Sequence, residues 1–324
     1  MDDVLTVLDE SGRWRARDVR YMEGTWDRLR DELPEFKKDD FRAADDAQAN
    51  PYMQSVVRLP HRKMEQAVPV GVVSKTYTLA QHRDVAEKCL EGIREGGIDP
   101  EGLRCQVGLT ELGEWMNLRI YFPKSYDFRA KDEKPLGLRL ECFNSVDGSS
   151  RLVVLLGWLR FVCTNGMVIW ETKAAELRTI HNQQMDVERI PRLVCEGMRL
   201  VEQAREQLAS WENETVASNQ LRTWVNGELA ELWGKKAACR TFHICTSGQD
   251  VEFAKPFEGG QPADRAVRGV RPVPGAPQTA KNLYDVSQAL AWLASSRANS
   301  DERVAWQLQV AELIARLKGT PAST

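Results

Sequence analysis

The sequence lacks the motifs that mark the common nucleotide-dependent and hydrolytic enzymes. It contains no Gly-x-x-x-x-Gly-Lys-Ser/Thr loop, no dinucleotide fingerprint, no His-Glu-x-x-His and no Gly-x-Ser-x-Gly elbow. ATP-driven, redox and classical hydrolase chemistries therefore lose support. An active site of scattered carboxylates stays open, because one sequence does not reveal it. We expect a binding protein more than an enzyme, with no cofactor and no assigned catalytic residue.

Long apolar runs and a secretory leader are also absent. No run approaches the length needed to span a bilayer, and the N-terminus is acidic where a signal peptide would be basic. The net charge of −3 argues against a globally basic nucleic-acid binder. The seven cysteines are odd in number and scattered, which favours reduced thiols over a disulfide framework. These features predict a cytoplasmic protein without membrane association.

The clearest structural pattern is a β-hairpin around Asp147-Gly148. Residues 136–143 alternate apolar and polar side chains, as a half-buried strand does, whereas residues 152–156 are apolar throughout, as in a strand covered on both faces. Asp-Gly tolerates the positive φ angles of a tight turn. A second turn, at Asn165-Gly166, predicts a further short strand over residues 167–170.

Two motifs in this region carry a family resemblance. They are Asn144-Ser-Val-Asp-Gly-Ser149 and Arg160-Phe-Val-Cys-Thr-Asn-Gly166. Their pairing resembles a large phage- and plasmid-borne family, catalogued as a domain of unknown function and labelled phage/plasmid-like protein. The similarity runs from about Val68 to the C-terminal helices, with His181 and residues 282–285 as weaker matches. It implies a mobile genetic element as origin and supplies no catalytic residues.

The periodicities along the chain predict an α+β fold. We expect an antiparallel, meander-like sheet from about Val68 to Trp170, a helix inserted over residues 78–96, and a helical C-terminal half. The predicted organisation has three parts: a charged N-terminal arm (1–50), an antiparallel sheet core (51–175), and a helical region (176–324) with a basic Gly/Pro loop at 254–281.

Two candidate sites for metal or proton chemistry are weak. His82 lies on the predicted inserted helix, where we place it on the polar side without a partner carboxylate. Cys239, His243 and Cys245 have no spacing known for structural zinc, and an alternating strand gives the same pattern by chance. We therefore expect no metal.

The alternation of the predicted strands suggests a surface for nucleic acid. Arginines and aromatic rings share one parity on neighbouring strands: Trp115, Arg119, Tyr121, Arg139 and Phe143. Bases stack on such rings while arginines meet phosphates, although helices covering this face would make the rings core residues. The Gly/Pro loop adds Arg265, Arg268 and Arg271, which suit a phosphate backbone unless the loop is only a linker.

The two turns suggest a second polar site. If both lie at one edge of the sheet, their polar groups come together: Asn144, Asp147, Gly148, Arg160, Asn165 and Gly166. Asn, Asp and Gly are also what tight turns require sterically, so a purely structural role explains them as well.

Two hypotheses of function follow. The first is a non-enzymatic nucleic-acid-binding protein of a phage, prophage or plasmid, favouring single strands and acting in recombination, replication or annealing. The alternative is a protein-interaction module that acts on a host or anti-phage defence complex through the helical half. Self-association fits either hypothesis. A nuclease with acidic metal ligands is a third, weaker reading.

Overall fold

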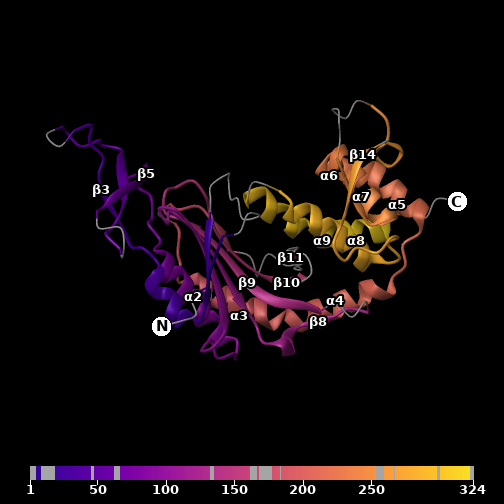
Figure 1. The fold of residues 1–324 in the computed structure, drawn as a ribbon, viewed down its shortest axis with the longest axis horizontal. Helices are drawn as coiled ribbons and strands as arrows, with labels where there is room; N and C mark the ends of the chain where they lie inside the picture. Colours follow the sequence, from indigo (N-terminus) through magenta and orange to yellow (C-terminus); the bar gives the residue numbers. More distant parts are fainter. Residues whose placement is uncertain are drawn as a thin grey trace. The chain divides into compact units, whose positions relative to one another are not determined.

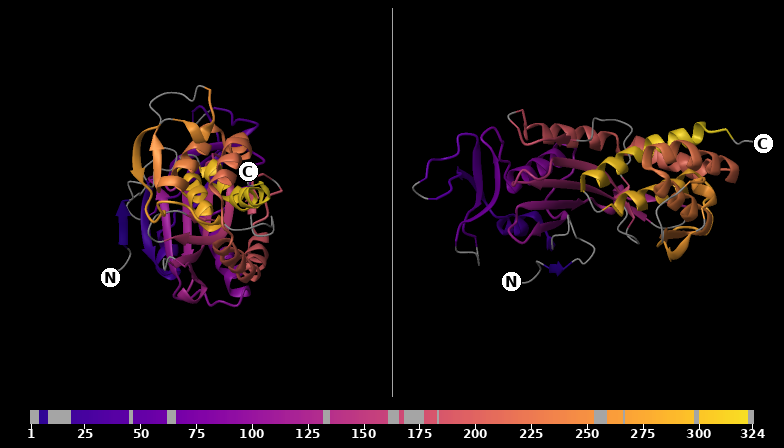
Figure 2. Two further views of the ribbon diagram at one scale, coloured as in Figure 1. Left: turned by 90° about the vertical axis from the view of Figure 1, so that its right-hand side faces the viewer. Right: turned by 90° about the horizontal axis from the view of Figure 1, so that it is seen from above.

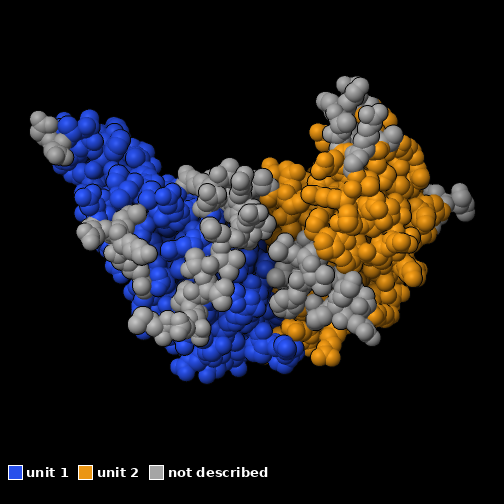
Figure 3. Space-filling view, viewed as in Figure 1, with its two compact units in different colours: residues 1–125, 138–156, 172–200 blue, residues 126–137, 157–171, 201–324 orange. Residues whose placement is uncertain are grey.

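The computed structural model describes residues 5–8, 19–44, 47–61, 66–131, 135–160, 166–167, 177–182, 184–252, 259–265, 267–297 and 300–321. The chain forms two compact units, drawn in blue and orange in Figure 3. Unit 1 comprises residues 1–125, 138–156 and 172–200, and unit 2 comprises residues 126–137, 157–171 and 201–324.

A nine-stranded sheet is the main β-structure (Figure 1). Its strands run in the order β1 (Leu5–Leu8), β2 (Val19–Gly24), β6 (Arg104–Thr110), β7 (Trp115–Tyr121), β9 (Pro135–Ser145), β10 (Leu152–Arg160) and β11 (Gly166–Met167). Two short strands pair outside this path, β8 (Phe128–Arg129) with β9 and β12 (Leu177–Thr179) with β10. β2, β6, β7 and β9 pair antiparallel, and the α+β class predicted from the sequence is confirmed.

One face of this sheet is apolar and carries helix α2 (His82–Glu95). The Cys142 thiol on β9 lies against the Cys89 thiol of α2, and this contact and burial raise the pKa of Cys142. α3 (Arg189–Arg199) packs on α2. Gly92 permits the close approach, because a Cβ there would lie 2.6 Å from the Pro191 carbonyl oxygen.

A small three-stranded sheet lies at one end of unit 1 (Figures 1 and 2). It consists of β3 (Phe36–Asp40), β4 (Met53–Arg58) and β5 (Val68–Ser74). Its inner face buries Phe36, Val56 and Val73 against Tyr77 and Val146. Val146 belongs to the turn between β9 and β10, so this turn is part of a hydrophobic core. Two short turns of helix, α1 (Trp26–Leu29) and η1 (Arg30–Glu32), precede the small sheet.

Unit 2 is mostly helical. Its helices are α4 (Val201–Asn213), α5 (Ser218–Trp224), the π-helical turn η4 (Val225–Leu229), α6 (Ala230–Trp233), α7 (Lys235–Ser247), α8 (Leu283–Ser295) and α9 (Ser300–Gly319). Short 3-10 turns are η2 (Lys124–Tyr126) in the chain segment where the units meet in sequence and η5 (Pro262–Asp264) in unit 2. The strands β13 (Gln249–Glu252) and β14 (Arg268–Pro272) form an antiparallel pair. No helix in the described part of the chain combines the length and apolar character that crossing a bilayer requires.

Three local predictions are wrong. The N-terminal 50 residues are not only an arm, because β2 lies inside the large sheet with Val19 and Met22 buried. The inserted helix begins at His82 and not at residue 78, since the Thr78 hydroxyl donates to the Asn182 carbonyl, 2.6 Å away. The predicted Gly/Pro loop is not entirely a loop, because it contains the strand β14, which pairs with β13.

The segment from Cys239 to Cys245 is also not a strand. It lies on α7, where Cys239 and Cys245 are buried and free. The six described cysteines are all free, as predicted, and Cys163 lies outside the described residues.

Candidate nucleic-acid interface

The five sheet residues predicted to face nucleic acid do lie on one face of the large sheet. The register places Tyr121 of β7 opposite Arg139 of β9. Trp115, Arg119 and Phe143 have the same alternation, so the five side chains project from the same side. The predicted grouping is therefore correct, whereas its binding of nucleic acid stays a prediction.

Trp115 cannot offer its ring to a base, which corrects the predicted stacking platform. Its side chain is 1% exposed, and its Nε1 donates to Asp147 Oδ1 at 3.0 Å and to Ser149 Oγ at 2.6 Å. Phe143 is 6% exposed. Both rings are core residues because of this burial, and Trp115 is bonded by turn residues that come more than 30 positions later in the sequence. Tyr121 is half-buried and is the predicted ring that retains an accessible surface.

The polar residues of this face form a hydrogen-bonded group around one carboxylate. Glu141 Oε1 accepts from Asn117 Nδ2 at 3.0 Å and from Arg119 Nε at 2.9 Å. Its Oε2 accepts from Arg139 Nη2 at 2.7 Å. Arg119 Nη1 also donates to Gln106 Oε1 at 2.9 Å. We call these five residues the Glu141 cluster.

The Glu141 cluster carries one excess positive charge in a buried place. The side chains of Arg119, Arg139 and Glu141 are 18%, 9% and 10% exposed. Burial would raise the pKa of Glu141, but Arg139 and Arg119 lower it to about 2. Burial and the charge of Arg119 lower the pKa of Arg139, against the opposing effect of Glu141. A second anion near Arg139 would therefore stabilise the cluster.

Arg104 also lies on this face, although it was not among the residues predicted from the sequence. It is the first residue of β6, opposite Tyr121, and its Cζ lies 4.6 Å from the centre of the Tyr121 ring. It forms an ion pair with Glu23 of β2. Neighbouring residues of a strand point to opposite faces, so the apolar Cys105 on one face places Arg104 on the other, and the sequence could have shown this.

The Asn144–Gly148 turn packs against the small sheet, with residues 144–146 buried, Asp147 half-buried and Gly148 exposed. Asn144 is 0% exposed, and a Cβ on Gly71 of β5 would lie 2.8 Å from the Cα of Asp147. Gly148 has φ +77°, as the turn chemistry predicts, and a Cβ on it would lie 3.1 Å from Val73 Cγ1. β9 ends at Ser145 and β10 begins at Leu152, so the connection between them is longer than a two-residue turn. The contacts favour the structural reading of this turn.

The Asn144 side chain is hydrogen-bonded to His82, which was predicted to be exposed. Its Nδ2 lies 3.0 Å from the Ala80 carbonyl and 2.9 Å from His82 Nδ1, while His82 Nε2 lies 2.8 Å from the Gly113 carbonyl. Because a carbonyl only accepts, Nε2 carries the proton and Nδ1 accepts from the amide. His82 is 0% exposed, and burial lowers its pKa to about 4. The prediction of an exposed His82 is wrong.

The periodicity of α2 could have located His82. It shares the stripe of Ala86, Cys89 and Ile93, which are all buried. His181, the weaker family match, comes to the same region. Its ring stacks on Tyr77 at 5.1 Å, its Nδ1 lies 3.2 Å from the Thr78 carbonyl, and burial lowers its pKa.

The second predicted turn is only partly described. Arg160 ends β10 and Gly166 begins β11, where the backbone of Gly166 pairs with Leu159. Asn165 lies outside the described residues. A joint site of this turn with Asn144 and Asp147 therefore stays a prediction.

The arginines of the Gly/Pro loop belong to unit 2. Arg271 Nη2 donates to Asp250 Oδ2 at 3.1 Å, and its Cζ lies 5.8 Å from the Trp292 ring. Arg268 lies on β14, and Arg265 is half-buried. The loop arginine Arg271 is thus engaged by a buried carboxylate, in contrast to the predicted free contact with phosphate.

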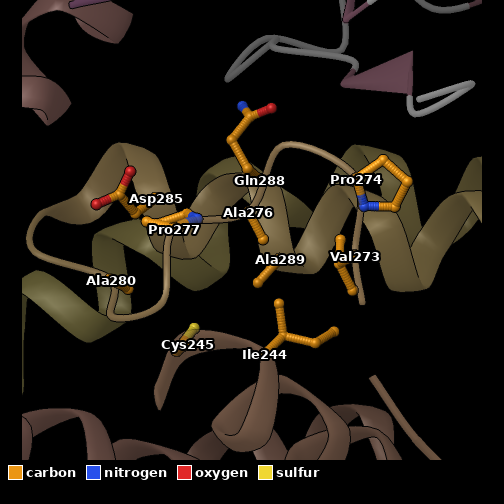
Figure 4. Close-up of a pocket in the computed structure, with 10 residues that line it drawn as sticks. All are labelled: Ile244, Cys245, Val273, Pro274, Ala276, Pro277, Ala280, Asp285, Gln288 and Ala289. Atoms are coloured by element: carbon orange, nitrogen blue, oxygen red, sulfur yellow. The ribbon is translucent and has the colours of Figure 1, made fainter. Parts of the chain in front are cut away.

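Unit 2 also contains a small cavity between α7 and α8 (Figure 4). Ile244, Cys245, Val273 and Ala289 line it, and Asp285 lies at its edge. Its volume of about 10 Å³ admits about one water molecule. No group of three or more His, Cys, Asp or Glu side chains suited to a metal occurs among the residues that the structure describes.

The comparison with protein families gives a match over the middle of the chain. A family model described as a domain of unknown function (DUF932) matches residues 69–266, more than half of the chain. The match includes both turn motifs and His181. No curated protein and no solved structure matches the chain significantly.

Proposed function

This chain belongs to the family of the domain of unknown function DUF932, and from that starting point we propose that it is a nucleic-acid-binding protein of a phage, prophage or plasmid. Single strands are the favoured ligand, with recombination, replication or annealing as the process served. The observation that carries the proposal is the buried excess of positive charge in the Glu141 cluster.

The charge of the sheet face supports a polyanionic ligand. Across β2, β6, β7 and β9 its charged members are Arg104, Arg119 and Arg139 against Glu23 and Glu141. Arg139 donates a single hydrogen bond to the described residues, to Glu141. A phosphate oxygen accepts from the remaining guanidinium donors and neutralises the excess, and each phosphate so bound releases counterions.

The half-buried Tyr121 ring favours single strands. Bases in a single strand are unstacked and lie on aromatic or guanidinium planes, whereas the bases of a duplex are already stacked. The face offers one such plane, where the Arg104 guanidinium rests on Tyr121. The expected binding is therefore weak in sequence preference and sensitive to salt.

Fluorescence anisotropy tests the proposal with labelled oligothymidine, the matching duplex and an RNA of the same sequence. With three arginines available, the slope of log affinity against log salt should be about −2 between about 50 and 200 mM salt. Single strands should bind more tightly than the duplex. Absence of binding at the lowest salt would overturn the proposal.

The small sheet supports a second candidate, a protein-interaction module. Val57 and Val72 share its outer face by register, and Val72 is 44% exposed. Phe41 directly follows β3 and Tyr52 directly precedes β4 in the sequence, and they are 38% and 77% exposed. Clustered exposed apolar side chains are typical of interaction surfaces. We therefore propose an interaction surface on unit 1, whereas the sequence predicted one in the helical half.

Sedimentation velocity tests whether this face joins two copies of the chain. The wild-type protein should sediment faster as concentration rises, and Val72→Asp should remove that dependence. The matched control is Val270→Asp, at another exposed valine that is 54% exposed and lies in unit 2. If the wild type is monomeric at all concentrations, this face does not mediate self-association.

A further inference from the structure

One cross-strand row of the large sheet places an aromatic ring between two arginines. Tyr121 ends β7, with Arg104 of β6 opposite on one side and Arg139 of β9 opposite on the other. Directly opposed residues project from the same face, so the three side chains form one line across three strands. Adjacent strands lie about 4.8 Å apart, which puts the two arginines about 10 Å apart at the backbone.

The two ends of this row differ in accessibility. The Arg104 side chain is 52% exposed, whereas that of Arg139 is 9% exposed. Arg104 rests on the ring, which is itself half-buried. The row is therefore open at one end, with a flat cationic plane, and closed at the other end, where a buried cation has few described partners.

We propose that Arg104, Tyr121 and Arg139 form a subsite for one nucleotide of a single strand. The base stacks on the Arg104–Tyr121 pair, and the phosphate accepts hydrogen bonds from Arg139. The subsite rests on the proposed function, since it names the place where that function begins.

The chemistry of the row fits a nucleotide better than a simple anion. A free phosphate needs only the cations, but the ring and the guanidinium plane add a stacking surface that every base can use. No side chain of the row reads a base edge, so the subsite should accept all four bases.

Occupation of the subsite requires two local changes: Arg104 leaves Glu23, and the closed end of the row opens enough for a phosphate to reach Arg139, whose side chain is 9% exposed. Arg104 is paired with Glu23, whose side chain is 32% exposed, and an ion pair exposed to this degree contributes little to stability. Arg104 can therefore shift on the ring while Glu23 returns to water. Arg139 gains a second anion without losing Glu141.

Isothermal titration with thymidine 5′-monophosphate, thymidine and inorganic phosphate tests the subsite on the full chain. The nucleotide should bind more tightly than either fragment. Tyr121→Leu should weaken nucleotide binding about ten-fold, while Tyr121→Phe, which keeps the ring, should bind as the wild type does. Arg104→Ala should weaken it to a similar extent.

The matched control is Arg192→Ala on α3 of the same unit. Arg192 is also ion-paired, to Glu196, but its side chain is 83% exposed and stands apart from the row in sequence and sheet. Circular dichroism melts of each variant confirm folding. Equal nucleotide affinities for the wild type, Tyr121→Leu and Arg104→Ala would overturn the subsite.

Oligothymidine binding separates the subsite from the wider function. If oligothymidine binds and the row variants leave both affinities unchanged, the subsite is wrong and the proposed function stands. If the monophosphate binds in a manner that depends on Arg104 and oligothymidine does not bind, the subsite stands and the proposed function is wrong.

Discussion

Two buried carboxylates in this chain each hold two arginines, and their surroundings differ. In unit 2, Asp250 is 1% exposed, while Arg240 and Arg271 are 22% and 55% exposed. Arg240 binds it with Nε and Nη2, both at 2.7 Å, and Trp292 Nε1 and the Val251 amide complete its partners at 3.0 and 2.8 Å. We call this group the Asp250 cluster.

The difference lies in where the excess positive charge resides. In the Asp250 cluster it faces water through Arg271, so solvent screens it. In the Glu141 cluster both arginines are largely buried, so the excess is poorly solvated. Both clusters contain two arginines and one carboxylate. The Asp250 cluster is stable without a ligand, whereas an anionic ligand would stabilise the Glu141 cluster.

The largest expected effect comes from removing the carboxylate of Asp250. Asp250→Asn should lower the free energy of unfolding by about 3–5 kcal/mol, because Arg240 loses both charged hydrogen bonds in a buried place. Urea denaturation measures it. Asp264→Asn is the control, since its pair with Arg222 has side chains 60% and 48% exposed and should cost less than about 1 kcal/mol. Similar losses in both variants would contradict the structural role of Asp250.

A pH series tests His82 of unit 1 in a range where neither buried carboxylate titrates in the folded state. In the folded state the pKa values of Glu141 and Asp250 are both lowered to about 2, so neither group gains a proton there between pH 6.5 and 4, and their unfolded pKa values of 4.5 and 3.8 add to the slope only below about pH 5. His82 has a folded pKa of about 4 and an unfolded value of 6.5. Its unfolded state therefore binds the proton first, and stability present above pH 6.5 is lost as the pH falls toward 4.

The loss from His82 should reach about 3 kcal/mol by pH 4. His82→Gln, whose amide can bond both Asn144 and the Gly113 carbonyl, should flatten the dependence in this range. Equilibrium unfolding in urea at several pH values measures it. An unchanged slope in the variant would mean that His82 is not the buried neutral group described above.

A third test asks whether the motif turn is structural, like the Asp250 cluster. Gly71→Ala would bring a Cβ within 2.8 Å of the Asp147 backbone, so the small sheet or the turn must shift, at a cost of about 2 kcal/mol. The control Gly227→Ala adds a Cβ that meets nothing within 4 Å. Thermal denaturation should show a lower Tm for the first variant alone. Full stability of Gly71→Ala would contradict the tight docking of the turn.

The smallest expected effect is rescue by phosphate. Glu141→Gln leaves two buried arginines without a carboxylate, and phosphate at about five times its Kd should restore about 1 kcal/mol of unfolding free energy. Asp250→Asn should gain less, because its Arg271 is already solvated. Unfolding in phosphate and in chloride at equal ionic strength compares them. Equal rescue of both variants would remove the distinction between the clusters.

The parts of the fold that the sequence predicted are those with a strong local period. Residues 136–143 and 115–121 alternate cleanly, so their strands and the shared face of Arg119, Tyr121 and Arg139 were predictable. β2 and β14 were missed. Their residues are charged or lie beside Gly and Pro, and only pairing with distant strands makes them regular.

The partners of the site residues were less accessible to sequence reasoning. The local sequence predicts Trp115 as an exposed stacking surface, but Asp147 and Ser149, more than 30 positions later, accept a hydrogen bond from its indole nitrogen. The local sequence predicts Arg271 as an unpaired cation of a loop, but the pairing of β14 with β13 places it beside Asp250. In both cases a polar partner distant along the chain decided whether the predicted contact surface remained available.

The most direct test compares oligothymidine affinity for one variant in each unit. Arg104→Ala removes an exposed arginine from the sheet face, and Arg271→Ala removes an equally exposed one from the Asp250 cluster, with side chains 52% and 55% exposed. We predict about ten-fold weaker binding for Arg104→Ala and a change within about two-fold for Arg271→Ala. Equal losses, or a larger loss for Arg271→Ala, would contradict it.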